Sequence, residues 1–190
     1  MTNDLMMDLT EGEMLELWKS RFRLLPARRD CTIEREDGID IDTVLLTDIR
    51  EWYAGLLLKG DVEMLPVEDL SNDLFADVST DGVVTVPLPA CCVRPVEWHV
   101  EGWERSVTRF YHPSTVEARC QNNFYLRGDR YNPAAVIFDD RLVLYSVEPG
   151  VDALVDKALC VVRPSDGHYK FNEAALATIW DYAKHYGLAD

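Results

Sequence analysis

The hydrophobic positions near the start of the chain recur every three or four residues, which is the period of an amphipathic helix. Thr10 and Glu13 have the spacing of a capping box, in which each side chain accepts a hydrogen bond from the other residue's backbone amide. This pattern predicts a helix from Thr10 to Leu25 that ends before Pro26.

A second helical stripe follows an acidic stretch and runs from Leu45 to Leu57. Asp40 or Asp42 is the predicted N-cap of this helix, because a short acidic side chain satisfies the first free amides. Gly60 stands where a glycine commonly ends a helix.

From about residue 62 the pattern changes to short runs rich in β-branched and aromatic residues, separated by turn-forming residues. Asp139 and Asp140 lie between two such runs and predict a tight hairpin. The predicted strands cover residues 83–88, 93–100, 106–111, 116–120, 124–127, 134–138, 142–147 and 159–162.

After Pro164 the helical period returns, with Asn172 as N-cap and Gly187 at the end. The order predicts an α+β fold with N-terminal helices, a central antiparallel β-sandwich or bent sheet, and a C-terminal helix. We divide the chain into a helical arm over residues 1–60 and a β-rich domain over residues 61–190, which the last helix closes, and we expect the two to form one compact unit.

The formal charge of the 190 residues is -15, from 34 acidic and 19 basic side chains. A chain this acidic lacks the basic surface that binds phosphate, so we expect neither direct nucleic-acid binding nor membrane binding. The acidic start and the absence of a long apolar run predict a cytoplasmic protein. The odd number of cysteines, five, and their irregular spacing predict reduced thiols and no disulfide framework.

The stretch "VPLPACCVRPVEWHVEGW", residues 86–103, gathers reactive side chains. Cys91 and Cys92 are neighbours, so in a strand they point to opposite faces, and no Cys-x2-Cys spacing occurs. We therefore expect no metal site and no cofactor. His99 alternates with Glu97 and Glu101 on the polar side of a strand, which predicts a solvated surface position without a catalytic role.

Other residues leave alternatives open. His112 and Cys120 form a nucleophile–base pair in the least favoured hypothesis, a small enzyme that uses His99, His112 or Cys120. Gly128 is expected to make a turn in "RGD", with Arg127 and Asp129 in solvent.

Four aromatic residues are candidates for contact with a protein partner. Trp103 follows Gly102 at a predicted loop tip, where an aromatic ring is a candidate contact residue. The whole set is Trp18, Phe22, Trp103 and Tyr186.

Three stretches resemble, in order and spacing, the head–tail adaptor proteins in the neck of tailed bacteriophages. They are "DTVLLTDIREWYAGLL" (42–57), "VPLPACCVRPVEWHVEGWERSV" (86–107), and "VVRP" followed by "NEAALATIWDYAKHYG". The resemblance implies a non-enzymatic structural protein of the virion or prophage. Such a protein acts as a homo-oligomeric ring and docks onto portal-like or tail-like subunits.

The chief rival is a soluble acidic module that regulates or inhibits a partner, for which the charge of -15 suits mimicry of nucleic acid. The acids are spread along the whole chain instead of forming one ridge, which favours the assembly protein. From net charge alone, we expect copies to repel one another at low salt and to associate more as salt rises.

Overall fold

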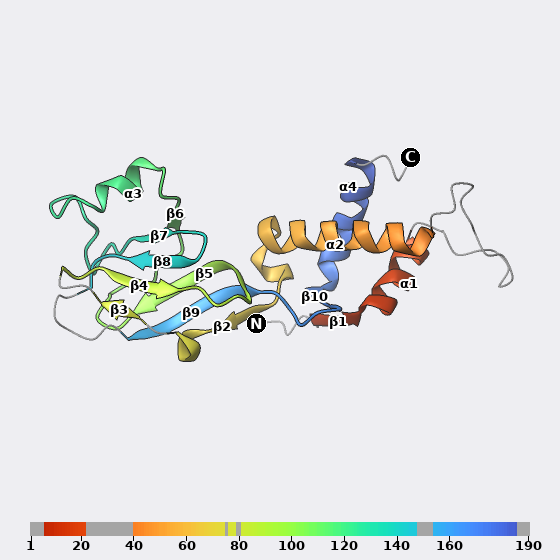
Figure 1. Ribbon diagram of the computed structural model, residues 1–190, viewed down its shortest axis with the longest axis horizontal. Coiled ribbons are helices and arrows are strands. Elements are labelled where there is room, and N and C mark those ends of the chain that lie inside the picture. Colours follow the sequence, from red (N-terminus) through yellow and green to blue (C-terminus); the bar gives the residue numbers. More distant parts are fainter. Residues whose placement is uncertain (1–5, 22–39, 75, 79–80, 148–153, 186–190) are drawn as a thin grey trace, which may run out of the picture. The chain divides into compact units, whose positions relative to one another are not determined.

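The computed structural model describes residues 6–21, 40–74, 76–78, 81–147 and 154–185 (Figure 1). It confirms the predicted α+β class. Contacts divide the chain into two compact units. Unit 1 comprises residues 1–66 and 163–190, and unit 2 comprises residues 67–162.

This division differs from the expected arm and β-rich domain, which met at residues 60 and 61. The C-terminal helix belongs to the unit of the N-terminal helices, because the strand before it pairs with a strand at the start of the chain. Unit 2 is therefore an insertion within unit 1.

The described residues of unit 1 form three helices, a two-stranded sheet and two short 3-10 turns. Its elements are β1 (Met6–Thr10), α1 (Glu11–Arg21), α2 (Ile41–Lys59), η1 (Val62–Met64), β10 (His168–Asn172), η3 (Glu173–Leu176) and α4 (Ala177–His185).

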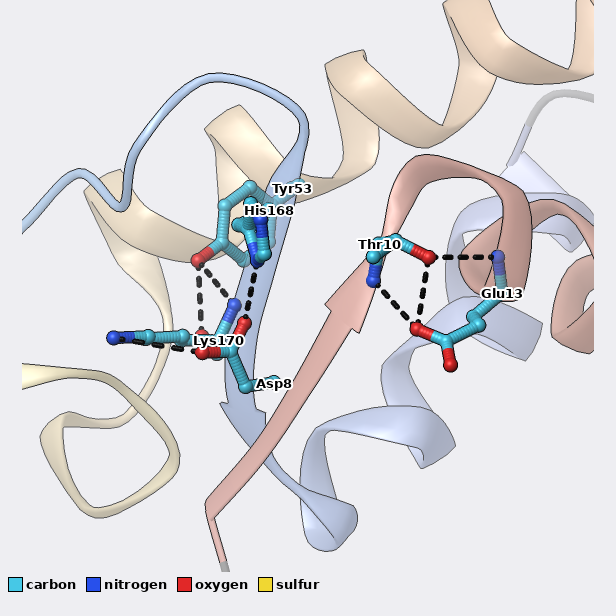
Figure 2. Close-up of polar contacts among 6 residues, drawn as sticks. All are labelled: Asp8, Thr10, Glu13, Tyr53, His168 and Lys170. Carbon is cyan, nitrogen blue, oxygen red and sulfur yellow. Dashed lines mark hydrogen bonds and ion pairs between the residues drawn. The ribbon is translucent and has the colours of Figure 1, made fainter.

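The helix caps follow the sequence prediction closely. The Thr10 amide donates to Glu13 Oε2 at 2.9 Å and the Glu13 amide donates to Thr10 Oγ1 at 3.4 Å, so the capping box of α1 is confirmed (Figure 2). Asp40 is the N-cap of α2 and accepts from the Asp42 amide. At the other end, a Cβ on Gly60 would lie 2.5 Å from the Leu56 carbonyl oxygen, which explains the glycine.

β1 and β10 pair antiparallel, with Asp8 opposite Lys170. Asp8 Oδ1 lies 3.0 Å from His168 Nδ1, and Asp8 Oδ2 lies 3.6 Å from Lys170 Nζ (Figure 2). The hydrogen bond with His168 is the main cause that lowers the pKa of Asp8. These contacts between strands far apart in the sequence hold the two ends of unit 1 together.

The Tyr53 hydroxyl of α2 satisfies both backbone groups of Lys170. It donates to the Lys170 carbonyl at 2.9 Å and accepts from the Lys170 amide at 3.0 Å (Figure 2). Tyr53 thus fastens α2 to β10 where a further strand would otherwise bind.

Aromatic rings fill the interior of unit 1. Trp52 of α2 lies 5.6 Å from Trp18 of α1 and 5.6 Å from Phe171 of β10, measured between ring centroids, and both pairs are edge-to-face. The Trp52 indole also donates to Thr178 Oγ1 at 3.0 Å, close to the start of α4. One side chain thereby joins three helices and a strand.

Where the structure describes unit 2, it contains nine short helices and strands besides a 3-10 turn. They are β2 (Val67–Asp69), η2 (Ser71–Asp73), β3 (Asp77–Val78), β4 (Val84–Pro87), β5 (Cys92–Val100), β6 (Phe110–Tyr111), α3 (Val116–Cys120), β7 (Ala135–Ile137), β8 (Arg141–Leu144) and β9 (Val155–Val162).

These strands form two sheets that share one core. The first has the order β2-β9-β5 and the second the order β3-β4-β8-β7-β6, in which only β6 and β7 run parallel. Buried side chains of both sheets, among them Trp98, Val86 and Leu144, belong to the same hydrophobic cluster. The predicted hairpin is confirmed, since β7 and β8 pair antiparallel across Asp139 and Asp140.

Two predicted strands are wrong. Residues 116–120 form α3, because Thr115 caps the segment by accepting from the Ala118 amide at 3.3 Å, and Glu117, Ala118 and Arg119 are good helix formers. Residues 124–127 form turns, not a strand. The sequence prediction also missed β1 and β10, whose pairing spans most of the chain.

Other predictions reach beyond the described residues: the predicted first helix continues to Leu25, and the last ends at Gly187. Of the helices in the described part of the chain, none has the length and apolar character needed to cross a bilayer.

We expect Tyr53→Phe to lower the free energy of unfolding by about 1–2 kcal/mol, because it leaves the Lys170 amide and carbonyl without their partner. Burial raises the pKa of Tyr53 to about 12. Because the folded protein holds the Tyr53 proton more tightly than the unfolded chain does, this hydroxyl stabilises the fold at pH values below about 10. That contribution is lost as the pH rises from about 10 toward 12.

Urea unfolding at neutral pH and at several pH values above 10 measures both effects. Tyr125→Phe is the matched control, because that side chain is 92% exposed. Equal stability of Tyr53→Phe and the control would show that the hydroxyl does not secure β10.

Candidate functional site

The cysteines lie in different environments around β5 and β9. Cys91 is exposed, Cys92 is half-buried, and Cys160 on β9 is fully buried in the core. Contact with Cys160, together with burial, raises the pKa of the Cys92 thiol, so this thiol stays protonated. The four described cysteines are free, and Cys31 lies outside the described residues. Among the described residues, no three His, Cys, Asp or Glu side chains are grouped to bind a metal.

The prediction that His99 is a solvated surface residue is wrong. Its side chain is 23% exposed, its Nδ1 lies 2.6 Å from Asp156 Oδ1, and its Nε2 lies 3.0 Å from the Trp103 carbonyl oxygen. Both ring nitrogens are therefore occupied by contacts that tie β5 to β9 and to the following turn. His99 is a structural residue, paired and partly buried.

The structure gives no contact between His112 and Cys120 among the described residues. His112 is exposed, and its Nδ1 lies 2.7 Å from Ser114 Oγ in the turn before α3. Cys120 is half-buried at the end of α3 and lines a groove in which His112 takes no part. The arrangement does not build the nucleophile–base pair of the enzyme hypothesis.

Two of the four predicted contact residues are in the interior. Trp18 is fully buried, and Trp103 is 6% exposed and donates from Nε1 to the Ser146 carbonyl at 3.1 Å. Gly102 does make the expected turn, with φ +92°, but the turn directs Trp103 inward. Phe22 and Tyr186 lie outside the described residues.

A different part of unit 2 has the character of a contact surface. Five of the nine exposed large hydrophobic side chains of the described residues lie within residues 116–131, which we call the aromatic segment. Phe124, Tyr125 and Leu126 are 75%, 92% and 60% exposed, and Val116 and Tyr131 complete the set. Clustered exposed apolar side chains of this kind mark interaction sites.

The backbone of the aromatic segment is held by buried polar side chains. Gln121, which is buried, accepts from the Gly128 amide at 2.9 Å and donates to the Glu117 carbonyl at 3.2 Å. Arg127 donates to the Gln121 carbonyl at 3.0 Å and to the Asp81 carbonyl at 2.8 Å. A Cβ on Gly128 would lie 2.5 Å from the Asn132 carbonyl oxygen.

This network shows that the expected solvent position of Arg127 is wrong, and it explains why Phe124 and Tyr125 stay exposed. Arg127 is not in solvent, since its side chain is only 12% exposed, and "RGD" is part of the support of the segment. With the backbone fixed from beneath, Phe124 and Tyr125 pack edge-to-face on each other, with ring centroids 5.8 Å apart, while staying exposed to solvent.

The surroundings of the aromatic segment are basic, whereas the remaining residues taken together are acidic. Residues 105–134 contain five arginines and two acidic residues, a formal charge of +3, whereas the remaining residues carry -18. Arg105, Arg109, Arg119 and Arg130 are exposed. Guanidinium groups also lie over rings, Arg109 over Tyr111 at 5.3 Å and Arg130 over Tyr131 at 4.8 Å.

A groove of about 530 Å³ runs beside the segment and is lined by Tyr111, Val116, Leu126 and Arg127 among others. In Figure 1, α3 and the loop after it lie beyond the β6 and β7 side of the five-stranded sheet. Sequence reasoning assigned these residues to strands and so missed the surface. The available signal was three consecutive large apolar residues, Phe124 to Leu126, within an arginine-rich stretch.

We expect His99→Ala to lower the free energy of unfolding by about 1–3 kcal/mol, because the half-buried Trp103 carbonyl and the Asp156 carboxylate both lose their partner. His112→Ala is the control, since that exposed ring forms its hydrogen bonds with Ser114 in its own turn. Thermal or urea unfolding of both variants decides whether His99 is paired and partly buried or lies on a solvated surface. Equal, small effects would restore the solvated position for His99.

We also expect the described cysteines to react with a soluble maleimide in the order of their exposure. Cys91 should be labelled first in the folded protein, and Cys160 only after unfolding, because its side chain has no exposed area. Peptide mass spectrometry of timed samples measures the order, and the urea-unfolded protein gives the common upper limit. Rapid labelling of Cys160 in the native state would contradict the packing of β9.

Comparison with known proteins provides no relative from which a function can be transferred. No protein-family model matches the sequence, and no curated protein matches it. Among the described residues, the aromatic segment is the feature that packing within unit 2 leaves unexplained.

Proposed function

We propose that this chain is a non-enzymatic assembly protein that docks onto other protein subunits through the aromatic segment, residues 116–131. The observation that carries the proposal is the exposure of five large apolar side chains within one short segment whose backbone is held by Gln121: Val116 on α3, and Phe124, Tyr125, Leu126 and Tyr131 after it. Aromatic and arginine side chains are the residues that contribute most to protein–protein binding.

The rigid support of the loop favours docking over other uses of an apolar surface. Gln121, Arg127 and Gly128 fix the backbone before any partner arrives, so binding does not have to order it. A fixed surface with a groove beside it suits a partner of defined shape, which is the requirement of an assembled structure.

The resemblance to head–tail adaptors gives the proposal its specific form, a ring of identical copies between portal-like and tail-like subunits. The expected partners are then encoded by neighbouring genes. A location in the host cytoplasm and then in the virion goes with this form.

The test is pairwise co-expression of the chain with each neighbouring gene product, followed by native mass spectrometry and titration of each purified pair. Phe124→Ser with Tyr125→Ser should raise Kd at least about tenfold, equivalent to 1.4 kcal/mol, because exposed aromatic anchors dominate such contacts. Folding should be unchanged, because exposed positions seldom alter stability by more than about 0.5 kcal/mol.

Leu58→Ser with Leu154→Ser is the matched control, since these side chains are 55% and 59% exposed and lie outside the aromatic segment. The control should bind like the unaltered chain. Complexes that survive the aromatic double substitution with unchanged Kd would refute docking through this segment.

A further inference from the structure

We propose that the partner of the aromatic segment is a second copy of this chain, which receives the segment on an acidic edge at residues 67–77 in a head-to-tail contact. The inference rests on the proposed function and names the partner of the same surface. We call the described residues of this range, 67–74, 76 and 77, the acidic edge.

Charge complementarity carries the first step. The acidic edge contains Glu68, Asp69, Asp73 and Asp77 and no lysine or arginine, whereas the region of the aromatic segment carries +3. All four acidic residues are exposed. An arginine-rich apolar surface finds in another copy of its own chain the acidic partner that it requires.

The acidic edge is also largely free of internal pairing. Asp69 accepts from the Ser71 amide and the Ala158 amide, each at 3.0 Å, and so has a structural role. In the part of the chain that the structure describes, no side chain pairs with Glu68, Asp73 or Asp77. Their carboxylates are therefore available to arginines from outside.

The positions of the two surfaces within unit 2 fit a head-to-tail contact. Asp77 begins β3, one edge of the five-stranded sheet, while α3 lies beyond the other edge, which is β6 (Figure 1). Glu68 lies on β2, the edge of the three-stranded sheet. A heterologous contact needs two different patches on each copy, and repeating it generates a ring or a filament.

The contact predicts a salt dependence opposite to the one expected from net charge alone. Net repulsion between copies of charge -15 would make association stronger as salt rises. If opposite charges meet at the contact, association becomes weaker as salt rises, because salt screens the attraction between arginines and carboxylates. Whether salt strengthens or weakens association therefore shows whether the net charge of the chain or the opposite charges at the contact dominate it.

Sedimentation velocity of the full chain tests the inference first. We expect concentration-dependent association whose Kd rises at least about fivefold between roughly 50 and 300 mM salt. Arg109→Glu with Arg119→Glu reverses two charges in the region of the aromatic segment. Glu68→Lys with Asp77→Lys reverses two charges of the acidic edge. Each double variant alone should be monomeric.

Mixing the two variants is the decisive step. The reversed segment of one variant then faces the reversed edge of the other, and association should return. Circular dichroism of each variant checks that it is folded. Arg21→Glu with Lys59→Glu changes the net charge by -4, and Glu63→Lys with Asp181→Lys changes it by +4; these reversals of exposed residues in unit 1 control for the net charge change of each test variant.

Every other outcome is assigned in advance. A monomeric unaltered chain, unchanged association of either variant, or a mixture that stays monomeric would overturn the second-copy contact. If self-association fails in one of these ways while binding of the neighbouring gene products still requires Phe124 and Tyr125, the proposed function stands and only this inference fails. Salt-sensitive binding of a fluorescent single-stranded DNA that Arg109→Glu with Arg119→Glu abolishes would assign the surface to nucleic acid instead.

Discussion

The pairing of β1 with β10 is the contact on which the architecture of unit 1 depends. It joins Met6–Thr10 to His168–Asn172, so the two ends of the chain must meet before unit 1 is complete. Bringing such distant segments together costs loop-closure entropy, although that cost grows slowly with loop length. The Asp8 contacts, the Tyr53 hydroxyl on Lys170, and the aromatic packing of Trp52 against Phe171 offset it.

The insertion of unit 2 follows from the same constraint. Val67 enters unit 2 directly opposite Val161, next to the exit at Val162, because β2 and β9 are hydrogen-bonded neighbours. Entry and exit points that lie close together let a compact unit be inserted without straining its host.

Sequence patterns predicted what depends on neighbours along the chain. The capping box at Thr10, the Asp40 cap and the hairpin at Asp139 all follow from local hydrogen bonding and spacing. Contacts between distant residues were not predictable in this way. Alternation placed His99 correctly on the polar side of β5 but gave no sign of Asp156 on β9, and the exposed aromatic segment depends on Gln121 being drawn inside.

The aromatic segment illustrates why burial by itself does not decide where apolar side chains lie. A free loop with three consecutive large apolar residues would fold back to cover them, since burying such side chains is worth about 1.5–3 kcal/mol each. Here the hydrogen bonds of Gln121 and Arg127, with the close approach at Gly128, fix the backbone in a form that holds Phe124 and Tyr125 outward. Exposed rings invite unspecific association, and the charge of -15 opposes it at long range. In the proposed docking, a partner has to match the shape of this surface and to meet its arginines with acidic groups at short range.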